Sequence, residues 1–347
     1  MSLARSATQV ALLWLAAASA PQVAPAADCS PAEGLRFICG PVATEDLVQV
    51  PATRWLLGSG LNVGQPARLQ RIDTRRRTAR LLQPKWQGAA PVTPDCTRPP
   101  DPQHWSTDGL AVLPGRHGRH RLYVANHGDR PAIELFDLRA GRDGPTVRWI
   151  GCVQLPTDTL PNAVVALRDG GLIVLSFHDP QDSQAWQRMA RGEDTGRLFE
   201  WHPGGVLQPL PDGQMSGGNG LALSADGHWL YASAWSGRRL VLLSRRDGTR
   251  RELALDFLPD NLKVLADGSL LVAGQRTTVE RIATCAGPRC PQPWVVARID
   301  IPSGSVRELA SGQGSARIDY ATGALQLDGT LYITARGDDR IAYLPAP

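Results

Sequence analysis

The chain has 347 residues, a formal net charge of +4, and 35 Gly and 28 Pro residues. A net charge this small, carried almost entirely by Arg, gives no support to a nucleic-acid partner, and we expect none. The many Gly and Pro residues favour short strands joined by turns over long helices. No low-complexity segment divides the sequence, so we predict a single large all-β domain over residues 28–347.

Residues 1–27 have the pattern of a secretory signal peptide. A single Arg precedes an apolar stretch, ATQVALLWLAAASA, and small residues suitable for cleavage follow it. A retained membrane anchor is the alternative, but the stretch is shorter than the ~20 residues that span a bilayer. Asp28 before Cys29 argues against a lipoprotein signal. We therefore expect a periplasmic or secreted protein with no stable membrane anchor after cleavage.

The six cysteines of such an exported protein are expected to form disulfides. Six cysteines allow about 15 connectivities, which sequence alone does not resolve. Proximity in the chain favours the pairs Cys29–Cys39 and Cys285–Cys290, which leaves Cys96 to pair with Cys152. Zinc binding is the rival interpretation, but no CxxC pair with matching His spacing is present.

A phrase made of a short apolar strand, a turn and a second strand recurs six times after the leader. The copies begin near Glu45, Asp108, Asn162, Asn219, Asn261 and Tyr320. Regular repeats of several strands each are typical of a β-propeller, which buries both faces of every sheet by radial packing. We therefore predict an all-β, six-bladed β-propeller.

Polar residues stand at the start of the innermost strand in five of the six copies, where a propeller brings them to its central axis. They are Glu45, Asp46, Asp108, Asn162, Asn219, Asp260 and Asn261, and His127 closes the second strand of the second copy. Turn formation would explain any one of them. Their repetition in register instead favours a shared site, and oxygen donors suit a hard cation such as Ca²⁺. We predict a central metal site that acts as a Lewis acid.

Further motifs accompany these residues along nearly the whole mature chain. They are Glu45-Asp46-Leu47, LYVANH ending at His127, IELF ending at Phe136, LPN ending at Asn162, GNG at 218–220 with SADG at 224–227, and LDF at 255–257 with Asp260-Asn261. Together they resemble the motifs of the calcium-dependent six-bladed propellers of the paraoxonase/arylesterase type. The gluconolactonase and senescence-marker proteins form the wider circle of this resemblance.

The resemblance implies one catalytic Ca²⁺ and a histidine in its active site. The implied metal ligands are Glu45, Asn162, Asn219, Asp260 and Asn261. His127 matches one of the two active-site histidines of the family, but Asp108 replaces the other. Asp108 is then a base, which a neighbouring cation would weaken by lowering its pKa, an additional ligand, or a bystander without a role in the chemistry. Ala163 replaces a carboxylate of the family's second, structural calcium site, so one ion is expected. Gln275 replaces a pocket histidine.

These features predict an enzyme that hydrolyses a small-molecule lactone or an aryl or otherwise activated ester. The metal would polarise the carbonyl while a water attacks it, with Asp108 or His127 as the base. Trp105, Trp186 and Trp235 either wall an apolar pocket or pack in the core.

Two other functional classes stay open. One is a non-catalytic periplasmic ligand-binding or scaffold propeller that keeps calcium for rigidity. The other is a metal-free propeller of the strictosidine-synthase kind, against which Glu45 and the Asp260-Asn261 pair argue. The absence of a GxSxG sequence argues against a serine hydrolase of the α/β type. The triplet Arg336-Gly-Asp338 is short enough to occur by chance.

Overall fold

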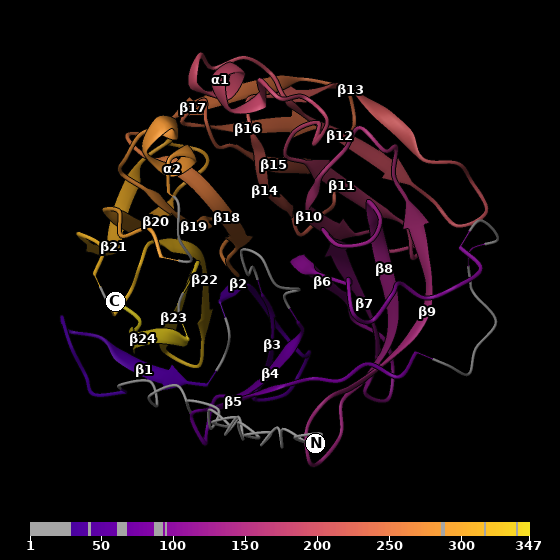
Figure 1. The fold of residues 1–347 in the computed structure, drawn as a ribbon, viewed down its shortest axis with the longest axis horizontal. Coiled ribbons are helices and arrows are strands. Elements are labelled where there is room, and N and C mark those ends of the chain that lie inside the picture. Colours follow the sequence, from indigo (N-terminus) through magenta and orange to yellow (C-terminus); the bar gives the residue numbers. More distant parts are fainter. Residues whose placement is uncertain are drawn as a thin grey trace, which may run out of the picture.

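The computed structural model describes residues 29–40, 43–60, 68–86, 93, 96–285, 289–315, 317–337 and 339–347. The predicted signal peptide, residues 1–27, lies outside them. The described chain forms six four-stranded antiparallel sheets arranged around a central axis (Figure 1), which confirms the predicted six-bladed β-propeller. None of the helices in these ranges is long and apolar enough to cross a membrane.

The first five blades each consist of four consecutive strands, numbered from the axis outward. Blade one contains β2 (Thr44–Gln49), β3 (Trp55–Gly60), β4 (Gln70–Asp73) and β5 (Thr78–Leu81), and blade two contains β6 (Thr107–Leu113), β7 (Arg119–Asn126), β8 (Ala132–Arg139) and β9 (Thr146–Gln154). Blade three contains β10 (Pro161–Ala166), β11 (Leu172–Ser176), β12 (Gly196–Trp201) and β13 (Gln208–Met215). Blade four contains β14 (Gly218–Leu223), β15 (Trp229–Ala234), β16 (Arg239–Ser244) and β17 (Arg250–Ala254), and blade five contains β18 (Leu258–Val264), β19 (Leu270–Gln275), β20 (Trp294–Ile299) and β21 (Val306–Gly312).

The sixth blade joins the two ends of the described chain. Its inner strands are β22 (Ala321–Leu327), β23 (Thr330–Ala335) and β24 (Arg340–Pro345), and its outermost strand is β1 (Arg36–Cys39). Figure 1 shows the indigo β1 beside the yellow β24, with which it pairs antiparallel. The pairing of β1 with β24 closes the ring of blades by hydrogen bonds within the sixth sheet.

The hydrophobic core lies between adjacent sheets rather than in one central mass. Between blades one and two, for example, Trp105 packs edge-on against Trp86 with ring centroids 5.0 Å apart, and lies 5.9 Å from Phe136. Trp105 is therefore a core residue, and of the two roles considered for it, packing is the one observed.

All three predicted disulfides are confirmed. The Cα atoms are 6.0 Å apart in Cys29–Cys39, 5.5 Å in Cys96–Cys152 and 5.6 Å in Cys285–Cys290. The first lies at the end of β1, the second ties the segment before β6 to β9, and the third closes the loop that follows α2 (Val279–Ala283).

Two short helices cover part of the end of the propeller at which the second strands of the blades finish. The helix α1 (Ala185–Ala190) follows β11 in blade three, and α2 follows β19 in blade five. They contact one another, and Met189, Val279 and Ile282 pack in one buried cluster with Trp235.

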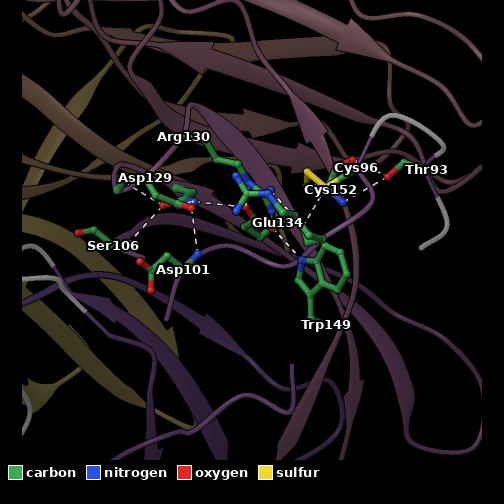
Figure 2. A network of polar contacts seen from close by, with 12 residues as sticks. Thr93, Cys96, Asp101, Ser106, Asp129, Arg130, Glu134, Trp149 and Cys152 are labelled. Carbon is green, nitrogen blue, oxygen red and sulfur yellow. Dashed lines mark hydrogen bonds and ion pairs between the residues drawn. A yellow bond between two sulfur atoms is a disulfide. The ribbon is translucent and has the colours of Figure 1, made fainter. Parts of the chain in front are cut away.

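A buried polar network holds the turn between β7 and β8 (Figure 2). The carboxylate of Glu134 accepts hydrogen bonds from Arg130 through Nε and Nη2, at 2.9 and 3.0 Å, and from Trp149 Nε1 at 2.8 Å. Asn126 Nδ2 donates to Glu134 and to Asp129, at 3.2 and 3.1 Å. The network therefore fixes the backbone on both sides of residue 127.

Replacing Glu134 by Ala should leave the Arg130 guanidinium and the Trp149 N–H without their buried partner. We expect the free energy of unfolding to fall by about 3–5 kcal/mol, measured by denaturant titration with the disulfides intact. Glu252→Ala is the control, because Glu252 pairs with Arg250 and Arg239 at the surface. That change should cost less than about 1 kcal/mol. Equal losses in the two variants would contradict the importance of burial.

Candidate functional site

The innermost strand of every blade has a shift in its pairing register at the same place. The shifts fall between Thr44 and Leu47, Thr107 and Leu110, Pro161 and Ala163, Gly218 and Leu221, Pro259 and Leu262, and Ala321 and Gly323. Such bulges re-aim side chains and are frequent beside active sites. Every predicted metal ligand, and Asp108, falls within one of these shifts.

Glycine allows the innermost strands to approach one another closely around the axis. A Cβ atom on Gly109 would lie 2.3 Å from the carbonyl oxygen of Asn162, and one on Gly220 would lie 2.4 Å from that of Asp260. Any other residue at these two positions would push neighbouring blades apart. The glycine that follows Asp108 or Asn219 is therefore part of the construction of the site.

The bulges open into a pocket of about 320 Å³. Its floor takes one side chain from each blade, namely Glu45, Asp108, Asn162, Asn219, Asp260 and Thr322. Asn261 contacts this floor from the side, because its Nδ2 donates to Glu45 Oε1 at 2.5 Å. The structure thus brings the residues of the predicted site together.

A second ring of side chains lines the same pocket, and each member directly follows the second-strand residue that pairs just before the bulge of the innermost strand. Its members are His127, Phe177, Trp235, Gln275 and Arg336. The equivalent residue of blade one, at position 61, lies outside the described part of the chain. We call this set the rim ring.

Aromatic side chains from blades three and four form one wall. Phe177 lies 5.6 Å from Trp235 and 6.0 Å from Trp186 between ring centroids, and the two indoles are 6.1 Å apart. Trp186 and Trp235 therefore line the pocket, and Trp235 also packs in the buried cluster, so that it has both of the roles considered. Trp235 Nε1 also donates to Gln275 Oε1 at 2.9 Å, and Gln275 Nε2 donates to Asp260 Oδ2 at 2.7 Å.

His127 and Asp108 form a close pair. His127 Nε2 lies 2.8 Å from Asp108 Oδ2 and 2.5 Å from the carbonyl oxygen of Pro161. With two acceptors beside it, Nε2 carries the proton, and Nδ1 makes no hydrogen bond to a described residue. Burial lowers the pKa of His127 to about 4, so the imidazole is neutral at pH 7.

The three carboxyl groups of the floor disfavour one another's ionisation. Burial raises the pKa of Glu45, Asp108 and Asp260 well above their ordinary values. Repulsion adds to this, from Asp108 on Glu45, from Asp260 on Asp108 and from Glu45 on Asp260, whereas a hydrogen bond with Glu45 acts the other way and lowers the pKa of Asp108. A floor with this charge has a strong electrostatic reason to bind a cation.

Blades one to five each contribute one buried side-chain oxygen atom that has no hydrogen-bond partner among the described residues. These atoms are Glu45 Oε2, Asp108 Oδ1, Asn162 Oδ1, Asn219 Oδ1 and Asp260 Oδ1. Leaving even one buried polar atom unpaired costs about 1–3 kcal/mol. The described residues hold no cluster of three or more His, Cys, Asp or Glu side chains spaced for a metal. The unpaired set instead mixes carboxylates with Asn amides.

Asp46 is not among the residues that line the pocket, and it has a cationic partner. Its Oδ1 lies 2.7 Å from Lys263 Nζ, and its carboxylate also accepts from the backbone N–H groups of Leu47 and Leu110, at 2.8 and 3.1 Å. The ammonium group thus neutralises the carboxylate beside the predicted ligands.

Five side chains of the pocket that are aromatic or carry a hydroxyl or charged group were not among the sequence-based candidates: Phe177, His178, Tyr320, Thr322 and Arg336. A signal for three rim-ring residues was present in the repeats, since the second strands LIVLSF and LYITAR end on Phe177 and Arg336 as LYVANH ends on His127. His178 and Tyr320 lie in connecting segments, where the repeat pattern says nothing about side-chain direction.

Comparison with known proteins supports the fold alone. No family model matches the sequence, and no curated protein is similar to it. Among solved structures, a gluconolactonase from Xanthomonas campestris is 21% identical over 90% of this chain and 89% of its own, with a TM-score of 0.56. A putative gluconolactonase is 18% identical over 92% and 94%, with a TM-score of 0.53. A calcium-binding regucalcin from Agrobacterium tumefaciens is 14% identical over 88% and 91%, with a TM-score of 0.54.

The charge of the floor predicts that Asp108→Asn stabilises the metal-free protein. Because burial and repulsion raise the pKa of Asp108 in the folded state, its ionised form opposes folding above its ordinary pKa. In chelator at pH 8 we expect the free energy of unfolding to rise by about 1–2 kcal/mol. Asp46→Asn should lower it by a similar amount, because Asp46 loses its charge pairing with Lys263. Shifts of the same sign in both variants would contradict this description.

Proposed function

We propose that the protein is an exported, calcium-dependent hydrolase that acts on a lactone. The observation that carries this proposal is the ring of five buried, unpaired oxygen atoms beside the His127–Asp108 pair at the floor of one pocket. Two proteins that share the fold are described as gluconolactonases and one as calcium-binding, which favours the same chemistry by analogy. Activity on aryl esters is a further part of the proposal.

The donor set fits Ca²⁺. Carboxylate and amide oxygens are the ligands that Ca²⁺ prefers, and it takes about 6–8 of them, some from water or substrate. We assign Glu45, Asn162, Asn219 and Asp260 as ligands through their unpaired oxygens. We also assign Asn261 to the ligand set, because its side chain contacts the Glu45 carboxylate. One ion is proposed, since Lys263 already neutralises Asp46.

The residues of the chain divide the work of hydrolysis between them. A bound Ca²⁺ would polarise the carbonyl of the lactone and offset the negative charge that develops on its oxygen. His127, neutral and protonated on Nε2, has Nδ1 available to take a proton from the attacking water. Asp108 accepts from Nε2 and thereby holds the ring in this tautomer and orientation, as carboxylates do in other His–carboxylate pairs. Phe177, Trp186 and Trp235 exclude water from the apolar side.

Export is inferred from the leader and the cysteines together. The predicted signal peptide would deliver the chain to an oxidising compartment, where the three disulfides are stable. The expected partner is a small molecule, because the candidate site is a pocket and not an extended charged surface.

The direct test is hydrolysis of a panel of aliphatic and aromatic lactones and aryl esters by the oxidised mature protein. We expect turnover of at least one lactone, loss of that turnover on chelation, and its return when calcium is restored. Turnover that persists in chelator would overturn the assignment of the metal. Calcium binding with no turnover on any substrate would favour the ligand-binding propeller instead.

Asn219→Ala tests the metal site without depending on the substrate. It removes one unpaired oxygen, so we expect calcium affinity to fall by at least about tenfold, or ~1.4 kcal/mol. Wild-type protein at a calcium concentration of 100 times Kd should gain about 2.7 kcal/mol of stability, and the variant should need more calcium for the same gain. Gln326→Ala, an exposed change on β22, is the control. Identical calcium titrations for Asn219→Ala and wild type would remove Asn219 from the ligand set.

A further inference from the structure

The rim ring contains one charged residue, Arg336, that forms no ion pair with a described residue. Among the described residues that line the pocket, Arg336 is the only Arg or Lys. It stands directly after β23, at the position that His127 occupies in blade two and Phe177 in blade three. Its guanidinium is therefore placed by the second strand of blade six at the wall of the pocket.

Arg336 has hydrogen-bonding capacity left over. Its Nη1 donates to the hydroxyl of Tyr320 at 3.3 Å, and its Nε is buried without a hydrogen-bond partner among the described residues. No described carboxylate forms an ion pair with it, although the buried carboxyl of Asp319 interacts with it electrostatically. Since a guanidinium carries five N–H donors in a planar fork, most of them are free to meet a ligand that enters the pocket.

Tyr320 gives this guanidinium a fixed neighbour. Its side chain is buried and lines the pocket, and burial raises its pKa to about 12, so the phenol remains protonated at neutral pH. A neutral hydroxyl orients the guanidinium but does not neutralise it. No ion pair with a described residue neutralises the positive charge, in contrast to Arg276 at the next position after the rim residue of blade five, which pairs with Asp256 and Glu308.

The pocket is consequently polarised across its width. In a ring of six blades the sixth lies opposite the third, so Arg336 stands across the pocket from the wall formed by Phe177 and Trp186. A ligand whose carbonyl sits on the floor would place one side against aromatic rings and the other against a guanidinium. Planar, bidentate pairing with carboxylate is the interaction that this group makes best.

We propose that the substrate is a small lactone that bears a carboxylate group, and that Arg336 is the specificity-determining residue that binds this carboxylate. The inference rests on the proposed lactonase function and specifies its substrate class. A monoanion matches the single positive charge of Arg336. A phosphate dianion would add a second negative charge beside Glu45, Asp108 and Asp260, which disfavours phosphorylated lactones.

A different role for Arg336 would be to offset the charge of the floor carboxylates. That role predicts other consequences. Removing the charge would then strengthen calcium binding and would change the handling of neutral and anionic substrates alike. The two roles are separated by comparing substrates that differ only in charge.

The experiment uses 5-oxotetrahydrofuran-2-carboxylate and its carboxamide, two lactones with the same ring and nearly the same shape. We expect wild type to prefer the carboxylate in kcat/KM, mainly through KM. In Arg336→Gln this preference should fall by about 10- to 100-fold, as expected for a lost charged hydrogen-bonded pair. Arg336→Lys should retain part of the preference. Arg276→Gln is the matched control and should leave both rates unchanged, because Arg276 pairs outside the pocket.

Equilibrium binding separates failure of this inference from failure of the proposed function. Calorimetry with 3-oxocyclopentanecarboxylate and its carboxamide, ring analogues with no bond to hydrolyse, should show the same preference and its loss in Arg336→Gln. Selective binding without hydrolysis of any lactone would support Arg336 and overturn the lactonase. Hydrolysis of the two lactones with equal kcat/KM would support the lactonase and overturn the proposed role of Arg336. A preference for a phosphorylated lactone, or tighter calcium binding in Arg336→Gln with selectivity intact, would also overturn the proposal.

Discussion

The close approach of the six innermost strands is the constraint on which the rest of the molecule depends. The Cβ distances of 2.3 and 2.4 Å at Gly109 and Gly220 show that adjacent blades touch through their backbones near the axis. Strands this close cannot all place large side chains in the centre. A bulge in each strand solves the problem, because it turns one short polar side chain per blade toward the pocket and lets the apolar alternation resume on the outer side.

This geometry concentrates negative charge in a buried place, and the surrounding structure is built to tolerate it. The floor carboxylates are held by neutral donors, such as Gln275 on Asp260 and Asn261 on Glu45, rather than by Arg or Lys. A neutral donor fixes an oxygen without cancelling its charge. By contrast, Glu134 in the body of blade two is fully paired with Arg130 and Trp149. The same residue types thus serve stability where they are paired and binding where they are left unpaired.

Much of the fold could be predicted from sequence because its signals are local and repeated. Six copies of strand, turn and strand specify six blades, and repetition of polar residues at one position identifies the floor without knowledge of any contact. The interactions that sequence could not reveal join distant parts of the chain. Lys263 pairs with Asp46, which lies 217 positions away in the sequence. Trp105 packs between two blades, and the periodicity of hydrophobic residues within a helix or strand does not predict such a contact. Arg336 was hidden for another reason, since its importance comes from the position it shares with His127 and not from its sequence neighbours.

The floor and the rim ring therefore carry different kinds of information. Floor residues come from bulges enclosed by neighbouring backbones, and all six of them carry a side-chain oxygen. Rim residues come from strand ends that open into the pocket, and the five described members are chemically diverse: an imidazole, a phenyl ring, an indole, an amide and a guanidinium. Under the proposed function, we expect a change at the floor to alter cation binding and a change at the rim to alter which substrate is bound above it. The Asp108–His127 contact joins the two rings, because a floor carboxylate orients a rim imidazole at 2.8 Å. Asp108 thus gives His127 a hydrogen-bonding partner and also adds a negative charge to the floor.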